Sequence, residues 1–230
     1  MTNDSNSAPE IQATPEPDFA EIGRLLFAGY CDFFWAASKI DNLPPMGALE
    51  IAMSGRSNVG KSSLLNALTN RNSLARTSNT PGRTQQLNFF ALAAEIPNER
   101  LRLVDMPGYG YAAASKGKIS SWTTLMHAYL RGRSTLARVF VLIDGRHGVK
   151  DTDKEMLDLL DKSASSYQVI LTKLDEVKIS EREQRVQDTL LALARRPAAF
   201  PHVIFTSSKT GEGIPELRTA IARLMAERGH

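Results

Sequence analysis

The chain has 230 residues, of which 42% are hydrophobic and 23% charged, and its formal net charge is +3. This composition is typical of one globular domain with a short tail, and it excludes a collagen-like chain. One cysteine, Cys31, cannot form an internal disulfide, and no Cys or His cluster has zinc-site spacing, so the sequence fits a reducing cytoplasm. No apolar run reaches the roughly 18 residues of a membrane span, and residues 25–37 lack the basic flank of a signal peptide. We therefore expect no membrane partner.

The charge is unevenly distributed along the chain. The first 21 residues carry five acidic residues and no Lys or Arg, whereas residues 22–230 hold 28 basic and 20 acidic residues, a balance of +8. A basic body of this kind indicates a polyanionic partner such as nucleic acid. A merely soluble basic surface explains it equally well.

The first 47 residues predict a tail and a small packed segment. Residues 1–17 are rich in Ser, Asn, Thr and Pro and have little that is large and apolar, which predicts a disordered acidic leader. Asp18 and Glu21 resemble a capping arrangement at the start of a short helix, and an extended piece follows through Phe33, Phe34 and Trp35. We expect residues 18–47 to pack on the main domain; a partner surface is the alternative for the three aromatic residues.

From residue 48 onward, short β-rich runs alternate with helical patterns. The predicted strands are residues 49–53, 87–92, 101–105, 139–144, 169–172 and 203–206. The predicted helices are residues 61–69, 120–130, 152–162, 180–195 and 214–227. This alternation predicts an α/β fold of three layers, a mainly parallel six-stranded sheet with helices on both faces, in one domain over residues 48–230.

One connection departs from the alternation. Residues 95–100, between the second and third strands, are too few for a helix and include Pro97 and Asn98. The two strands are therefore expected to form a hairpin, with one antiparallel strand at an edge of the sheet.

A phosphate-binding loop is predicted after the first strand. Two glycines flank four residues and are followed by Lys and Ser, between a predicted strand and a predicted helix. Glycines allow backbone N–H groups to turn toward phosphate oxygens, and the helix N-terminus adds positive potential. Lys61 is expected to reach the β- and γ-phosphates, and the Ser62 hydroxyl to bind magnesium. The loop residues are Gly55, Arg56, Ser57, Asn58, Val59, Gly60, Lys61, Ser62 and Ser63.

Two further motifs follow on later strands. At the end of the third strand, Asp105 can hold magnesium through water and Gly108 can approach the γ-phosphate. After the fifth strand, Asp175 can accept hydrogen bonds from the ring N–H and the exocyclic amine of guanine, which adenine does not offer. The Lys173 stem can lie along the ring. The remaining predicted nucleotide-binding positions are Met106, Pro107, Thr172, Leu174, Thr206, Ser207, Ser208 and Lys209.

The ordered motifs resemble those of small GTPases, and most specifically the EngB family of ribosome-biogenesis GTP-binding proteins, within the TrmE-Era-EngA-EngB-septin-like GTPase superfamily. The resemblance covers roughly residues 30–228. It rests on the stretches 55–63, 80–85, 105–112 and 144–147, of which 80–85 and 107–112 are the most family-specific. Leu174 and Glu176 depart from the expected pattern, where a small and a basic residue would stand.

The resemblance implies the P-loop GTPase fold, hydrolysis of GTP to GDP with Mg²⁺, and catalytic roles for Lys61, Thr84 and Gly108. Gly82, Arg83 and Thr84 would form switch I, with Thr84 completing the magnesium shell. The resemblance also implies a bacterial cytoplasmic monomer that assists assembly of the large ribosomal subunit, through ribosomal RNA and protein. It further implies a need for the protein in normal cell division and septation.

Hydrolysis is expected to be slow without a partner. Efficient GTPases often have a glutamine that orients water directly after the glycine of this motif, and here that position is Tyr109. The alternative is that Tyr109 is only a packed or partner-facing aromatic residue. Related GTPases that have asparagine at the position of Asn58 use it to hold potassium, so K⁺ is expected to accelerate hydrolysis. The alternative is that Asn58 only stabilises the loop backbone.

Other residues leave several interpretations open. An RNA-facing patch is predicted from five basic residues: Arg131, Arg133, Arg138, Lys116 and Lys118. A solvated helix face explains these residues nearly as well. His127 and His147 are assigned to structure or surface rather than catalysis, and Asp144 to orienting the turn that follows it. A GTP-regulated adaptor of the division machinery and an ATP-hydrolysing enzyme are the alternative functions.

Overall fold

The computed structural model describes residues 17–72, 74, 86–92, 100–110 and 116–230, with the backbone alone for 116–123. The predicted leader and the predicted turn at 95–100 lie almost entirely outside these residues. The elements are α1 (Phe19–Ala28), β1 (Cys31–Ala37), η1 (Ile40–Asn42), β2 (Leu49–Gly55), α2 (Lys61–Leu68), β3 (Leu87–Leu92), β4 (Leu101–Asp105), α3 (Lys116–Gly132), β5 (Leu136–Asp144), α4 (Asp151–Lys162), β6 (Tyr167–Thr172), η2 (Leu174–Glu176), α5 (Ile179–Leu193), β7 (Ile204–Phe205) and α6 (Ile214–Glu227).

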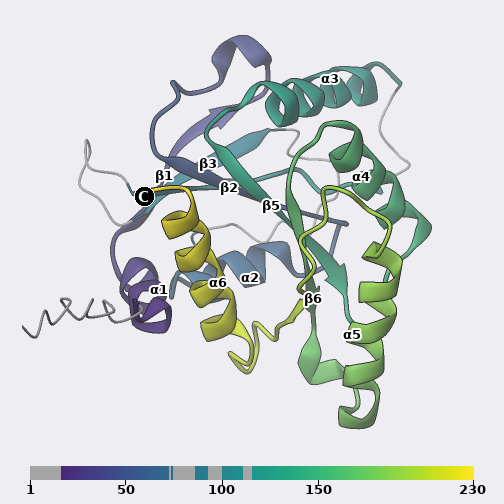
Figure 1. The fold of residues 1–230 in the computed structure, drawn as a ribbon. Helices are drawn as coiled ribbons and strands as arrows, with labels where there is room; N and C mark the ends of the chain where they lie inside the picture. The colour runs from purple at the N-terminus through teal and green to yellow at the C-terminus, as the bar shows by residue number, and fades with distance from the viewer. Residues whose placement is uncertain (1–16, 73, 75–85, 93–99, 111–115) are drawn as a thin grey trace, which may run out of the picture.

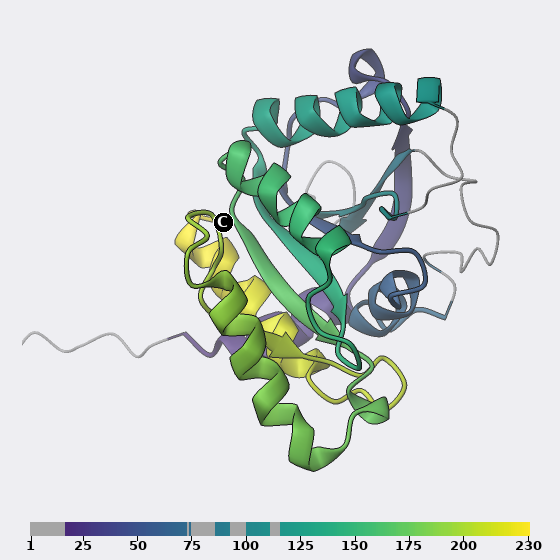
Figure 2. The same ribbon diagram turned by 90° about the vertical axis from the view of Figure 1, so that its right-hand side faces the viewer.

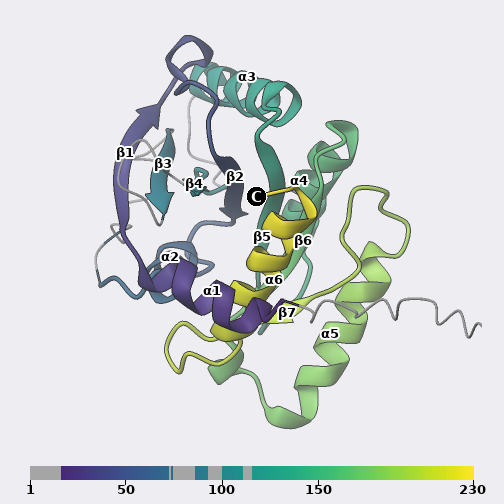
Figure 3. The same ribbon diagram turned by 60° about the vertical axis from the view of Figure 1, so that its left-hand side comes forward.

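The seven strands form one sheet in the order β1-β3-β4-β2-β5-β6-β7, which Figure 3 shows with β1 at the left. Strand β3 runs antiparallel to β1 and β4, and the other paired strands are parallel. The α/β class and the β3–β4 hairpin are as predicted. The count of six strands is wrong, because the extended piece after α1 pairs with β3 along its whole length and moves the antiparallel strand away from the edge.

The aromatic residues of β1 divide between the core and the surface. The Phe34 ring lies 6.2 Å from the Phe89 ring in an edge-to-face arrangement. The pairing shifts at a bulge between Phe33 and Trp35, and these two residues stay 50% and 41% exposed. Successive side chains of a strand point to opposite faces of the sheet, so neighbouring aromatic residues in β1 have different environments.

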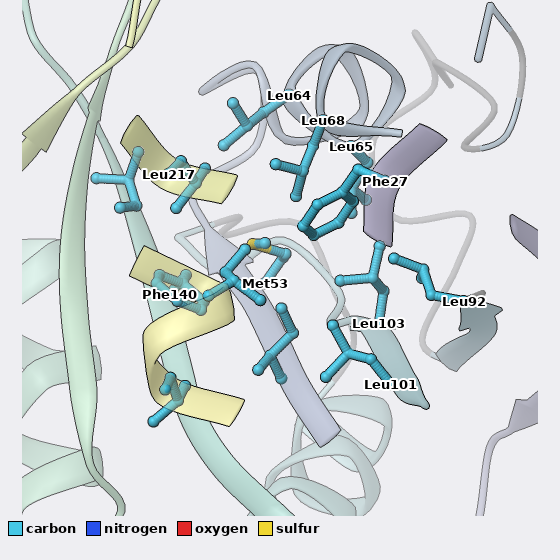
Figure 4. Packing of buried hydrophobic residues seen from close by; sticks show 14 of the residues in the cluster. Phe27, Met53, Leu64, Leu65, Leu68, Leu92, Leu101, Leu103, Phe140 and Leu217 are labelled. Carbon is cyan, nitrogen blue, oxygen red and sulfur yellow. The ribbon is translucent and has the colours of Figure 1, made fainter. Parts of the chain in front are cut away.

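Helices cover both faces of the sheet (Figures 1 and 2). One buried cluster joins α1, α2 and α6 to one face, and a second joins α3, α4 and α5 to the other. Figure 4 shows part of the first cluster, with Phe27 of α1, Leu64 of α2 and Leu217 of α6 around Met53 of β2. Because β2 lies between the two helix layers, all seven of its residues are buried.

Helix α1 is held closely against α6. The Asp18 carboxylate caps α1 by accepting from the backbone N–H groups of Ala20 and Glu21, at 3.0 and 3.1 Å. A Cβ on Gly23 would lie 2.6 Å from the Arg218 carbonyl oxygen, so this approach of the two helices requires glycine. Among the described residues, no helix is long and apolar enough to cross a membrane.

Candidate functional site

The predicted phosphate loop connects the carboxyl end of β2 to the N-terminus of α2. Gly60 precedes the helix with φ of 102°, and Asn58 has φ of 64°, a left-handed conformation that asparagine tolerates better than most residues. A Cβ on Gly55 would lie 2.8 Å from Val59 Cγ1, which explains the first glycine. The loop therefore has the tight turns that aim backbone N–H groups at an anion, in front of a helix N-terminus.

The second predicted motif lies beside this loop. Strand β4 is parallel to β2, so both carboxyl ends meet at one edge of the sheet, and the Lys61 ammonium contacts the Asp105 carboxylate there. A Cβ on Gly108 would lie 3.2 Å from Ser57 Oγ. Half-buried Ser62, in the first turn of α2, adds a hydroxyl to the same region.

Tyr109 is bound to the phosphate loop and to α4. Its N–H donates to the Gly55 carbonyl at 3.2 Å, its own carbonyl accepts from Ser57 N–H at 3.4 Å, and its hydroxyl donates to Asp153 Oδ1 at 3.0 Å. The ring is buried, and burial together with the Asp153 charge raises the pKa of Tyr109 far above its usual range. The structure thus agrees with the packed-aromatic interpretation of Tyr109.

The two predicted base-reading loops also come together. Ser207 Oγ donates to Asp175 Oδ1 at 2.6 Å, and Leu174 N–H donates to the Thr206 carbonyl at 3.0 Å. The Ser207 hydrogen bond lowers the pKa of Asp175, so the carboxylate stays ionised. Its two oxygens form an acceptor pair between the loops after β6 and β7.

Lys173 links the base-reading loop to the phosphate loop. Its ammonium donates to the Asn58 carbonyl at 3.2 Å and lies 2.9 Å from Asp144 Oδ2. Thr172 Oγ1 donates to the Val59 carbonyl at 2.7 Å. These contacts hold residues more than 100 positions apart in the sequence at one edge of the sheet.

Asp144 is more than a turn former. Asp144 accepts a hydrogen bond from the Arg146 backbone N–H at 3.1 Å, which suits the predicted role in orienting the turn, and its carboxylate also accepts from the Arg146 guanidinium at 2.7 and 2.9 Å. Burial would raise the pKa of Asp144, but the hydrogen bonds from Arg146 and Lys173 outweigh burial and hold the pKa well below its usual range. Spacing alone did not reveal the contact with Lys173, although the position of Asp144 at a strand end was a signal.

Comparison with known proteins gives the family. Residues 50–173 match the family model of the 50S ribosome-binding GTPase. A probable GTP-binding protein EngB of Rhodopseudomonas palustris is 63% identical over 215 residues, which cover 94% of this chain and 98% of the relative. The chain belongs to the EngB family of GTP-binding proteins. A second EngB relative, from Nitrobacter winogradskyi, is 59% identical and covers 92% of this chain and 96% of its own.

Solved structures support the fold. A crystal structure of a probable EngB protein aligns with a TM-score of 0.57 at 24% identity, covering 77% of this chain and 99% of that chain. A structure of Era from Aquifex aeolicus aligns with a TM-score of 0.62 at 21% identity, covering 78% of this chain and 57% of that one. The α/β architecture of this EngB family member is therefore the P-loop GTPase fold.

The predicted site residues of this EngB family member fall into two groups. Gly82, Arg83 and Thr84 lie outside the described residues. The others lie at or directly after the carboxyl ends of β2, β4, β6 and β7, including the first turn of α2: Gly55, Arg56, Ser57, Asn58, Val59, Gly60, Lys61, Ser62, Ser63, Asp105, Met106, Pro107, Gly108, Thr172, Lys173, Leu174, Asp175, Thr206, Ser207, Ser208 and Lys209. Carboxyl ends of neighbouring parallel strands form the usual ligand crevice of such sheets.

The RNA-facing patch is wrong for two of its arginines. Arg133 is buried and donates to the fully buried Glu50 carboxylate at 2.5 and 3.0 Å. Arg138 is also buried, 3.2 Å from Gln168 Oε1 and 3.9 Å from the centre of the Phe200 ring. Arg131 is exposed, and the side chains of Lys116 and Lys118 lie outside the described part of the chain. An acidic residue inside the apolar strand 49–53 was the signal for a buried cation.

The histidines and the acidic residues of the described chain form no metal cluster of their own. His127 is half-buried on α3, and His147 is exposed in the turn after β5. Within the described residues, no group of three or more His, Cys, Asp or Glu side chains could hold a metal ion. The described oxygen donors near the phosphate loop, Ser62 and Asp105, suit a hard cation whose remaining ligands are phosphates and water.

Proposed function

We propose that this EngB family member is a cytoplasmic switch that hydrolyses GTP to GDP and phosphate and assists assembly of the bacterial large ribosomal subunit. Its GTP form docks on ribosomal RNA and protein and leaves after hydrolysis, and cells need it for normal division and septation. The observation that carries the nucleotide assignment is the ionised Asp175 carboxylate, fixed by Ser207 beside Lys173. The ribosomal assignment is supported by the matched family model, whose description names the 50S ribosome.

Asp175 supplies the base specificity. Its two oxygens accept from the two donors on one edge of guanine, whereas adenine would leave a carboxylate unpaired. The Lys173 stem lies along the base. The N–H groups of Thr206 and Ser207 donate to the Leu171 and Glu212 carbonyls, so the Ser208 N–H is assigned to the guanine oxygen. Nucleotide competition tests this assignment: GTP and GDP should displace a fluorescent GDP analogue, and ATP should not.

The phosphates and Mg²⁺ are assigned to the phosphate-loop edge. Backbone N–H groups of residues 55–63 and the Lys61 ammonium hold the phosphates. Ser62, Asp105 and Thr84 are the residues that would hold Mg²⁺, and the ion would neutralise phosphate charge when bound. The Lys61 ammonium already pairs with the Asp105 carboxylate. The same ammonium therefore neutralises Asp105 when no phosphate is bound.

Hydrolysis is slow without a partner because Tyr109 does not replace a water-orienting glutamine. Its hydroxyl is engaged by Asp153, and Lys61, Thr84 and Gly108 remain to stabilise charge on the transferred phosphoryl group. GTP and GDP forms then differ at residues 82–84 and 106–118.

Potassium at Asn58 is the second part of the hydrolysis proposal. The left-handed conformation of Asn58 also suits the alternative, in which the residue only shapes the loop. GTP turnover in matched potassium and sodium buffers separates the two: faster turnover in potassium supports the cation site, and equal rates remove it.

Co-sedimentation with purified ribosomal subunits tests the ribosomal role. The protein loaded with a non-hydrolysable GTP analogue should pellet with large subunits, and the GDP-loaded protein should remain in the supernatant. Equal behaviour of the two forms with large subunits would contradict the proposal and favour the adaptor of the division machinery.

A further inference from the structure

Four charged side chains of alternating sign form a chain along the carboxyl edge of the sheet. Glu176 Oε2 accepts from Arg146 Nη1 at 2.7 Å, Arg146 Nη2 donates to Asp144 Oδ2 at 2.7 Å, and the same Asp144 oxygen lies 2.9 Å from Lys173 Nζ. The chain joins the turn after β5 to both ends of the loop that begins after β6. We name Glu176, Arg146, Asp144 and Lys173 the charge chain.

The Lys173 end of the charge chain reaches the phosphate loop. Lys173 has φ of 61°, a conformation that non-glycine residues rarely adopt. Its ammonium is held there by two oxygens, Asp144 Oδ2 and the Asn58 carbonyl. Because Asp144 and the Asn58 carbonyl both hold the Lys173 ammonium, the aliphatic part of the side chain has a fixed conformation beside the proposed base site.

The Glu176 end of the charge chain holds the short helix η2, which carries Asp175. Arg146 binds η2 through Glu176 on one side, and Ser207 binds Asp175 on the other. The loop is thereby fastened from the β5 side and from the β7 side. Neither Asp144 nor Arg146 is within the predicted nucleotide-contacting loops.

We propose that Asp144 and Arg146 are positioning residues for guanine nucleotides, which hold the Lys173 stem and the Asp175 carboxylate in the geometry that receives the base. The inference rests on the proposed nucleotide site and assigns it two residues outside its motifs. Preorganised groups bind more tightly because less ordering is required when the ligand arrives.

A purely stabilising role fits the charge chain poorly. The Arg146 and Glu176 side chains are 35% and 48% exposed, and ion pairs with such exposure contribute little to folding. The Asp144 side chain is only 15% exposed, so water screens its ion pairs less. Substituting Asp144 should therefore have a larger effect than substituting Glu176. Both substitutions should change guanine-nucleotide affinity more than the free energy of unfolding.

Asp144→Asn is the decisive variant. Loss of the counter-ion should weaken GDP binding about 10-fold, the effect of a hydrogen bond to a charged group, while inorganic pyrophosphate should compete with equal strength in both proteins. Asp158→Asn on α4, which breaks a 2.9 Å pair with Arg196, is the control and should leave both affinities unchanged. If Asp144→Asn weakened the binding of GDP and of pyrophosphate equally, the defect would be general and the proposal would be overturned.

Two further variants grade the effect. Arg146→Gln and Glu176→Gln should each weaken GDP binding by a few-fold, about the value of an exposed ion pair, and Glu21→Gln, which breaks an exposed 2.7 Å pair with Arg24 on α1, should not. In a Lys173→Met background, Asp144→Asn should have much less effect, since its main target is gone.

The outcomes separate this inference from the proposed function. If the unmodified protein binds no guanine nucleotide, the proposed function fails. If it binds GDP and Asp144→Asn binds GDP equally well, the positioning role alone fails. An undiminished effect of Asp144→Asn in the Lys173→Met background would also overturn the positioning role.

Discussion

Two clusters of carboxylates and basic side chains lie at opposite ends of the parallel strands. At the amino end of β2, the fully buried Glu50 accepts from Arg133 and from the Tyr129 hydroxyl at 3.1 Å. At the carboxyl end of β5, Asp144 accepts from Arg146 and Lys173 in a partly exposed cluster. The two clusters use the same chemistry and differ in their access to solvent.

The comparison shows how burial decides what a charge pair can do. Arg133 also donates to the Pro44 carbonyl at 2.7 Å, so the Glu50 cluster fastens the end of α3 and the segment before β2 inside the protein. A buried charge that loses its partner is strongly destabilising. The Asp144 cluster is screened by water, so it contributes less to folding and leaves Lys173 accessible to a ligand. The first cluster therefore governs stability and the second governs binding.

Breaking the buried cluster should give the largest effect. Glu50→Gln leaves Arg133 buried without a counter-ion and should lower the free energy of unfolding by about 3–5 kcal/mol. Urea unfolding measures the change. Folded Glu50→Gln protein at low temperature should still bind GDP with unchanged affinity. A loss of GDP affinity with little loss of stability would reverse the assignment of the two clusters.

Changing the base-reading carboxylate should give the next largest effect. Asp175→Asn should weaken GDP binding about 100-fold, because an amide donates where guanine also donates, with little change in the free energy of unfolding. Titration with a fluorescent GDP analogue measures it. Equal weakening of GDP and ATP would show that Asp175 does not select the base.

Removing the Tyr109 hydroxyl, which belongs to neither cluster, should give a smaller effect. Tyr109→Phe deprives the buried Asp153 carboxylate of a donor and should cost about 1 kcal/mol of stability. Single-turnover GTP hydrolysis should stay unchanged, because the hydroxyl faces Asp153. A slow Tyr109→Phe enzyme of normal stability would make Tyr109 part of the catalytic machinery.

The pH dependence of stability should reveal the smallest effect. An unfolded aspartate has a pKa of about 3.9, and that of folded Asp144 is lower. Its ionised form therefore stabilises the fold above the unfolded pKa, and this contribution disappears as the pH falls through the folded pKa. The difference in unfolding free energy between the protein and Asp144→Asn should be constant near neutral pH and shrink below about pH 4. A difference that grows in acid would contradict the lowered pKa.

Local patterns predicted most of the fold and brought the motifs to the right loops. The phosphate loop was readable because its glycines and the following helix are set by neighbouring residues, and helix 214–227 was predicted with the bounds it has. The edge strand β1 was not predicted as part of the sheet, because its pairing with β3 joins Cys31 to Leu92 across 61 positions. The environments of Arg133 and Arg138 were missed for the same reason.

The sequence by itself determined the alternation of strands and helices, the order of the nucleotide motifs and the family, since each is encoded in short stretches. Only the tertiary structure decided which charges meet. It buried Arg133 against Glu50, joined Asp144 to Lys173 and turned the Tyr109 hydroxyl to Asp153. The physical reason is that an ion pair depends on distance and solvent exposure, and both are fixed by the packing of elements far apart in the chain.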